Sequence, residues 1–188
     1  MPRRGLDSRQ VIDAAASIAD RDGLEAVTLA RLAHSLGVRP PSLYHHVAGH
    51  DAVLRAIALR GLGELTACLQ AAALGRAGPE ALAATAVAYR EYARAHPGRY
   101  AALQRGPAPG DSEHEEAALA AVQVLSAVLR GWRLEGEEML HAVRVIRSAL
   151  HGFVSLEAGG GFALPLDRDR SFERLIETLA AGLSPAAG

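Results

Sequence analysis

The spacing of apolar residues along the chain is helical nearly everywhere. Apolar side chains recur every three to four residues, and no stretch shows the sustained alternation that is typical of a strand. Asp7 or Ser8 can cap a first helix that extends to about residue 21, and Gly23 can end it. Thr28 can cap a short second helix over 29–36, after which Gly37 permits a tight reversal. The pattern therefore predicts an all-α protein.

The third predicted helix is short, and the helices after it are longer. Residues that precede Pro40 and Pro41 are pushed out of the helical region, so this helix begins only near Pro41, and Ala48-Gly49 interrupts it. A fourth helix follows residue 50 and extends towards residue 74, and a fifth begins at Pro79 and ends near residue 96. The Pro/Gly-rich stretch 106–111 reads as a surface loop. Further helices are predicted over about 112–130, 137–158 and 171–183.

The second and third helices, joined by a glycine turn, predict a helix-turn-helix. In that motif the second helix enters the major groove of DNA. Leu43 and Val47 lie four residues apart and can hold this helix to the core. Hydroxyl and imidazole groups then point outward and can contact phosphates or bases, and the helix N-termini at Thr28 and Pro41 suit phosphate oxygens. The outward side chains are those of Ser42, Tyr44, His45 and His46.

The segment TLARLAHSLGVRPPSLYHHVAGHDAVL, residues 28–54, resembles the DNA-binding domain of the tetracycline-repressor (TetR) family. Segments 88–103 and 147–179 resemble the C-terminal domain of one TetR subfamily. The resemblance implies a three-helix DNA-binding domain over 1–50 and a helical ligand-binding and dimerisation domain over 51–188. It also implies a homodimeric repressor that binds a palindromic double-stranded operator and is released by a small-molecule effector.

The resemblance also implies roles for individual residues. Thr28 and Tyr44 would hold phosphates, and His50 would touch the DNA backbone. The family usually has Lys where this chain has His50, and an imidazole is largely neutral at pH 7. Residues 1–50 contain six arginines and five acids, so weak non-specific DNA affinity is expected. The residues implied to face or flank bases are Arg39, Pro40, Pro41, Ser42, His45 and His46.

Several other side chains allow two interpretations each. Five aromatic residues either line an effector pocket or belong to the ordinary core: Tyr89, Tyr92, Tyr100, Trp132 and Phe153. His151 is a ligand contact or a core or interface histidine. Arg3, Arg4 and Arg9 form a DNA-seeking arm or a solvated terminus.

Composition limits the class of protein further. The 188 residues are 49% hydrophobic, which is enough for a real core, and the net charge of −1 decides nothing about nucleic acid. A single cysteine excludes an intramolecular disulfide and fits a reducing compartment. Because no run of about 18 uncharged apolar residues occurs, no membrane segment is expected, and the predicted location is cytoplasmic.

A helical enzyme or small-molecule carrier that uses a C-terminal pocket is the alternative function. An enzyme needs a nucleophile with a base, a metal cluster or a phosphate-binding loop, and Gly159-Gly160-Gly161 reads instead as a helix terminator. A metal site at His45, His46 and His50 is a further alternative, although Ala48-Gly49 interrupts the helix between His46 and His50 and Asp51 is the only carboxylate at ligand spacing. We predict no enzyme, no cofactor and no metal.

Overall fold

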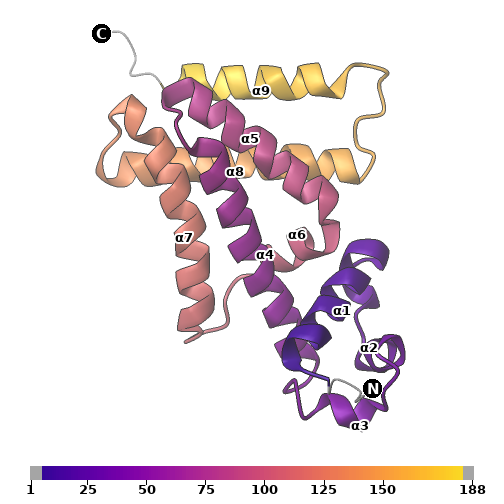
Figure 1. Cartoon of the computed structure of the whole chain (residues 1–188). Coiled ribbons are helices and arrows are strands. Elements are labelled where there is room, and N and C mark those ends of the chain that lie inside the picture. The colour runs from indigo at the N-terminus through magenta and orange to yellow at the C-terminus, as the bar shows by residue number, and fades with distance from the viewer. Residues whose placement is uncertain (1–5, 184–188) are drawn as a thin grey trace. The chain divides into compact units, whose positions relative to one another are not determined.

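The regular elements of the computed structural model, which describes residues 6–183, are all helical (Figure 1). The prediction of an all-α protein is therefore confirmed. Two single 3-10 turns occupy Leu24–Ala26 and Arg130–Trp132. The α-helices are α1 Ser8–Asp22, α2 Leu29–Ser35, α3 Pro40–Leu43, α4 His50–Ala73, α5 Gly78–Ala95, α6 Pro97–Leu103, α7 Ser112–Leu129, α8 Gly136–Ala158 and α9 Arg168–Gly182.

The described residues form two compact units. The first comprises residues 6–64 and 95–115, and the second comprises 65–94 and 116–183. Helices α4 and α7 each contribute to both units. The boundary that the sequence suggests at residue 50 follows the helix-turn-helix, whereas the first compact unit continues into α4 and also takes in α6.

Local capping explains where the first helices begin. The Asp7 carboxylate accepts a hydrogen bond from the backbone N of Gln10 at 2.7 Å, and the Gln10 side chain accepts one from the Asp7 backbone N at 3.0 Å. This reciprocal pair satisfies two amides that the first turn of α1 leaves open. Thr28 caps α2 by accepting from the backbone N of Arg31 at 3.2 Å. Asp7 and Thr28 are both residues that the sequence predicts as helix caps.

The first unit has a continuous apolar core that joins α1, α2, α3 and the first half of α4. Its side chains are almost completely removed from water, which favours burial by about 25 cal/mol per Å² of apolar surface. Because the core includes one anchor from the very short α3, packing on neighbouring helices supports α3. The buried residues are Val11, Ala15, Ile18, Ala19, Val27, Leu32, Ala33, Leu43, Val53, Leu54, Ile57, Ala58 and Ala102.

Helix α6 packs against α1 with almost no space between the two backbones. The sequence analysis assigns no helix to 97–103, yet Pro97 occupies the first helical position, where its missing N–H costs nothing. Gly98 is buried, and a Cβ at this position would overlap the backbone carbonyl of Ala19 and the amide of Asp20. Only a residue without a side chain therefore fits at this crossing.

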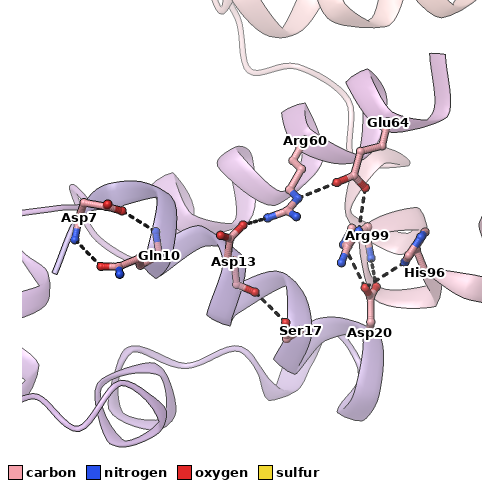
Figure 2. Close-up of polar contacts among 9 residues, drawn as sticks. All are labelled: Asp7, Gln10, Asp13, Ser17, Asp20, Arg60, Glu64, His96 and Arg99. Atoms are coloured by element: carbon pink, nitrogen blue, oxygen red, sulfur yellow. Dashed lines mark hydrogen bonds and ion pairs between the residues drawn. The ribbon is translucent and has the colours of Figure 1, made fainter. Parts of the chain in front are cut away.

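A chain of charged side chains joins α1, α4 and α6 beside this crossing (Figure 2). Arg60 on α4 pairs with Asp13 on α1 and, at 2.7 Å, with Glu64. The other Glu64 oxygen lies 2.8 Å from Arg99 on α6. Arg99 completes the chain by pairing with Asp20 on α1 at 3.0 Å, and its backbone N also donates to Asp20 at 2.9 Å. Packing and charge thus fix the same three helices.

A buried arginine organises part of the second unit. Arg90 on α5, which is 8% exposed, donates to both oxygens of Glu157 on α8 at 2.9 and 2.5 Å. Its guanidinium lies 4.8 Å from the ring centre of Phe172 on α9 and 5.3 Å from that of Phe153. The hydrogen bonds from Arg90 lower the pKa of Glu157. Helices α5, α8 and α9 therefore meet at one cation.

Helix α9 begins three residues earlier than the sequence predicts, at Arg168. Asp167 caps it by accepting from the backbone N of Asp169 at 2.8 Å.

Helix α8 ends at Ala158. Gly159 follows this last helical residue, and Gly160 has a φ of 71°. The interpretation of 159–161 as a helix terminator is confirmed.

No single helix among residues 6–183 is both long and apolar enough to cross a membrane. By length and composition alone, the segments Ser112–Trp132 and Gly136–Ala158 together could cross a membrane, and they are bent by 113° relative to each other.

We expect Gly98→Ala to destabilise the first unit by about 2 kcal/mol, because its methyl group forces α1 and α6 apart. Gly63→Ala on the exposed side of α4 is the matched control, since a Cβ there meets nothing within 4 Å. The control should be neutral or stabilising, because Ala favours a helix over Gly. Thermal unfolding of the full chains measures both, and equal midpoints for the two variants would contradict the close crossing.

Candidate nucleic-acid interface

The turn between α2 and α3 has the geometry of a helix-turn-helix. Gly37 adopts a φ of 66°, a left-handed conformation that glycine tolerates without strain. The backbone N of Val38 then donates to the carbonyl of Ala33 at 3.0 Å and closes the reversal. Leu43 is completely buried and Val47 is half-buried against the same core. The predicted turn and both predicted anchors are confirmed.

The recognition segment, residues 39–46, contains only four helical residues, Pro40–Leu43. Arg39 has extended backbone angles, and Pro40 and Pro41 form the first turn, so α3 begins one residue earlier than predicted. After Leu43 the chain continues as a hydrogen-bonded turn, in which the backbone N of His46 donates to the carbonyl of Leu43 at 2.8 Å. The segment is a single turn of helix followed by a tight turn.

A contact with α1 fixes the end of the recognition segment. The Ser8 hydroxyl donates to the backbone carbonyl of His46 at 3.2 Å. Nothing in the sequence pattern indicates this hydrogen bond, because 38 residues separate its two partners.

The predicted contact residues of the recognition segment are accessible to a partner. Tyr44 is 62% exposed, which is unusual for a large aromatic residue on a short helix packed against a core. Ser42 and His46 are half-buried. The exposed residues are Arg39, Pro40, Pro41, Tyr44 and His45. One short segment thus presents two imidazoles, a phenol, a hydroxyl and a guanidinium to solvent.

Thr28 combines a structural bond with a free donor. Its hydroxyl oxygen accepts from the backbone N of Arg31, so the hydroxyl hydrogen is still available to a phosphate oxygen. The side chain is exposed at the N-terminus of α2, where backbone amides also favour an anion. A phosphate contact at Thr28 stays a prediction that this geometry allows.

His50 has a structural role that sequence reasoning missed. Its Nε2 lies 2.7 Å from the carbonyl oxygen of Val27. A carbonyl only accepts, so Nε2 carries the hydrogen, and this bond ties the start of α4 to the residue before the α2 cap. The remaining nitrogen, Nδ1, lies 3.9 Å from Asp51 in a side chain that is 47% exposed. The predicted contact with the DNA backbone, which stays a prediction, would fall to Nδ1.

The arginines near the recognition segment differ in their availability. Arg21 and Arg31 both pair with Asp22, at 2.8 and 2.5 Å. The hydrogen bond from Arg21 lowers the pKa of this carboxyl group. Arg9 and Arg39 have no ion pair with any described residue. Arg3 and Arg4 lie outside the described residues.

The five candidate effector contacts have varied surroundings. All five are buried, but Tyr100 belongs to the first unit and the other four to the second. Trp132 donates from Nε1 to the carbonyl of Ala180 at 3.3 Å. The ring centre of Phe153 lies 4.9 Å from those of both Phe162 and Phe172. Trp132 and Phe153 therefore have structural partners, and an effector contact at any of the five, including Tyr89 and Tyr92, stays a prediction.

The structure also shows a cavity that sequence reasoning missed. It has a volume of about 380 Å³, within the range of small-molecule sites, and lies in the first unit between the first turns of α4 and the loop before α7. Arg55 at its wall pairs with Asp111 at 2.6 Å, which lowers the pKa of Asp111 to about 2. The other lining residues include Leu54, Ala58, Arg105 and the buried His114.

Residues 6–183 contain no group of three or more His, Cys, Asp or Glu side chains arranged to hold a metal ion. His151, another candidate contact, has Nε2 3.5 Å from the Ser155 hydroxyl.

Two family models match the chain. Residues 11–65 match the model described as bacterial regulatory proteins, tetR family. Residues 82–179 match the model described as tetracyclin repressor-like, C-terminal domain. The first match covers the helix-turn-helix and the second covers most of the second unit.

Curated relatives extend over nearly the whole chain. An uncharacterized HTH-type transcriptional regulator of Mycobacterium tuberculosis is 37% identical over 95% of this chain and 82% of its own length. A second uncharacterized HTH-type regulator, from Bacillus subtilis, is 35% identical over 97% of this chain and 95% of its own length.

Solved structures agree with this fold. A protein of unknown function from Rhodococcus sp. RHA1 has a TM-score of 0.83 and 26% identity, and covers 98% of this chain and 100% of its own. A TetR variant from Acinetobacter baumannii, solved with minocycline, has a TM-score of 0.71 and 22% identity over 95% of this chain and 96% of its own. At this lower identity the second likeness shows the fold alone.

We expect Tyr44→Phe to weaken the binding of DNA upstream of the chain's own gene by about fivefold. The change removes one hydroxyl donor, a hydrogen bond of about 1 kcal/mol, and keeps the ring. Because Tyr44 is exposed, the unfolding temperature should not change. Gel-shift titration and thermal unfolding measure the two effects. Unchanged DNA affinity would show that Tyr44 contacts no phosphate.

Proposed function

The chain belongs to the TetR family of bacterial transcriptional regulators, and from this premise we propose that it is a homodimeric, ligand-released repressor. Its operator would be a palindromic double-stranded DNA site, read by α2 and α3. The observation that supports this proposal most is the recognition segment, which presents polar side chains on a helix anchored by the buried Leu43.

The geometry suits DNA better than a packing role. A segment that serves packing hides its large aromatic residue, whereas Tyr44 is mostly exposed. Thr28 at the N-terminus of α2 and Tyr44 after α3 would hold phosphates, while Arg39, Ser42, His45 and His46 would face bases. Phosphate contacts then set the register of the protein on the duplex, and base contacts specify the sequence.

A homodimer is proposed because one face of α8 combines apolar and small residues that this protomer leaves uncovered. Val145 and Leu156, which lie on the same side of the helix, are each about half exposed. Gly152 lies in the same helix, and a Cβ there meets nothing within 4 Å. With α9, this face suits a four-helix bundle in which each protomer supplies two helices. Such a pair would match the two-fold symmetry of a palindromic operator.

The effector is proposed to be an apolar or amphipathic small molecule. The solved TetR variant that holds minocycline, and a Streptomyces coelicolor relative solved with (S)-DNPA, support this class of ligand. The buried aromatic residues of the second unit are one candidate position, and the cavity beside Arg55 is another. Helix α4 contributes to both units as one continuous helix, so it is a direct covalent connection between them.

The family matches point to a transcriptional regulator. A regulator of this kind needs access to the chromosome, so we propose a cytoplasmic location with no membrane partner. The enzyme or carrier alternative would gain support only if the chain bound no DNA and turned over or carried a small molecule.

The test of the proposed function is selection of duplexes from a random-sequence pool, followed by titration of the best duplex with and without candidate effectors. We expect a palindromic consensus with half-sites about one helical turn apart. An effector should weaken duplex binding, and the duplex should weaken effector binding by the same factor, because coupling free energy is reciprocal. Failure of every duplex to bind would overturn the DNA-binding function, whereas a tight ligand without coupling would overturn only the release mechanism.

We expect Gly152→Arg to convert the dimer into a monomer without unfolding the protomer. The side chain has room in the protomer but would enter the proposed contact between copies, and Arg favours a helix over Gly. The matched control is Gly63→Arg on the exposed side of α4, which should leave the dimer intact. Sedimentation velocity at micromolar concentration measures both. A dimer that survives Gly152→Arg would place the interface elsewhere.

A further inference from the structure

The DNA-binding surface has few permanent cations. The whole chain contains no lysine, and residues 6–50 contain four arginines. Two of these, Arg21 and Arg31, are neutralised by Asp22. Within the described residues, that leaves Arg9 and Arg39 as the arginines of this segment without a carboxylate partner.

Three histidines in or just after the recognition segment can also become cations, and we call them the recognition histidines: His45, His46 and His50. His45 is exposed and His46 is half-buried. Neither has an ion pair with any residue between 6 and 183. A proton that they gain is therefore not neutralised inside the protein, and its charge is available to a partner.

The charged groups on the neighbouring helices are already engaged or are few. On α1, the Asp7 carboxylate accepts from Gln10, and near α2 Asp22 holds its two arginines. On α4, the fully exposed Asp51 lies 3.9 Å from Nδ1 of His50. Arg39, at the start of the recognition segment, adds one permanent positive charge. His34 on α2 is a further exposed imidazole of this unit, also without an ion pair among the described residues.

DNA would change this balance strongly. A duplex carries one negative charge for about every 1.7 Å of its axis, so it stabilises any cation held against its backbone. An imidazole is half protonated near pH 6.5 in model peptides, so a moderate increase in its proton affinity charges it at neutral pH. Binding of DNA and binding of protons then strengthen each other.

We propose that the recognition histidines take up protons when the chain binds DNA, so that operator affinity increases as the pH falls from 8 to 6. This inference rests on the proposed DNA-binding function. In this proposal the three imidazoles supply positive charge to the DNA contact, as arginine or lysine would do at any pH. The charge of the imidazoles differs because it depends on pH. The partner is a DNA duplex, whose negative backbone charge acts on His50 beside the phosphates and on His45 and His46 beside the bases.

The sign and size follow from linkage. Above the titration range the histidines are neutral both in the free and in the bound protein, so they contribute no charge to binding. As the pH falls, the bound form is protonated first, and affinity increases by up to tenfold per pH unit for each proton taken up. With a shift of one pH unit at each of two imidazoles, affinity should increase by about tenfold or more between pH 8 and pH 6.

The test measures the affinity of the best selected duplex from pH 8 to pH 6 at constant ionic strength. Three variants are compared with the unchanged chain. His45→Arg/His46→Arg fixes two positive charges, and His45→Gln/His46→Gln removes the ability to gain them. Gly63→Arg on the exposed side of α4, which adds a fixed positive charge outside the recognition segment, is the control. Circular dichroism at each pH confirms that every variant remains folded.

The unchanged chain and Gly63→Arg should bind about tenfold more tightly at pH 6 than at pH 8. The Arg variant should bind tightly at both values. The Gln variant should bind weakly, and in both variants only the pH dependence that His50 supplies should remain. The unchanged chain should also depend more steeply on salt at pH 6, by about 0.9 in logarithmic slope for each added phosphate contact.

Two results would overturn the inference while leaving the proposed function intact: a duplex that binds with a flat pH profile, or a Gln variant that keeps the full pH dependence. Absence of duplex binding at every pH would instead overturn the proposed function. If the Gln variant does not fold, the Arg variant and the salt slopes of the unchanged chain still decide the question.

Discussion

The close crossing of α1 and α6 is the constraint on which the first unit depends. At Gly98 the two backbones touch, so the positions of the helices cannot adjust without losing this contact. The charged chain from Asp13 through Arg60, Glu64 and Arg99 to Asp20 then sets the third helix, α4, against the same pair. Core packing alone tolerates sliding between helices, whereas a backbone contact combined with directed ion pairs favours one arrangement. The helix-turn-helix is built on this frame.

The recognition segment depends on packing against the core of the first unit, because it is too short to be stable as a helix alone. Helix α3 has four residues and one fully buried anchor, Leu43, and an isolated helix of this length is not stable in water. Two long-range hydrogen bonds complete its support: Ser8 to the carbonyl of His46, and His50 to the carbonyl of Val27. Both bonds are accepted by backbone carbonyls, so neither of them uses the side chain of Tyr44 or His45. These two side chains are therefore available to a partner.

The sequence predicts those parts of the fold that depend on local chemistry. Asp7 and Thr28 cap helices, Gly37 reverses the chain, and Leu43 anchors α3, because each effect depends on neighbours within a few residues. The segment 39–46 was identified for the same reason. Helix α6 was missed because seven residues provide too short an apolar period, although Pro97 at its first position was a usable signal. Other features join residues that are distant in sequence, and the pattern of a single sequence does not indicate them. They are the hydrogen bond from His50 to Val27, the ion pairs between α1, α4 and α6, and the cavity beside Arg55.

The chain uses its two kinds of basic residue for different tasks, and this explains how a nearly neutral protein can have a DNA-binding surface. The planar guanidinium forms paired bonds with carboxylates, and Arg55, Arg60, Arg90 and Arg99 all do so inside the fold. These bonds hold carboxylates in their charged form, as the pKa of about 2 at Asp111 illustrates, so such pairs do not change near neutral pH. Part of the arginine charge is thus held in ion pairs that support the fold. Histidine lacks this paired geometry and has an adjustable charge, which makes it a weaker structural cation and a more responsive one at a phosphate. His50 also holds the fold through Nε2, so one side chain serves both structure and the proposed contact. The charge of this surface therefore follows from the demands of the fold: Asp22 pairs with Arg21 and Arg31, and the proposed pH-dependent charge falls to the recognition histidines.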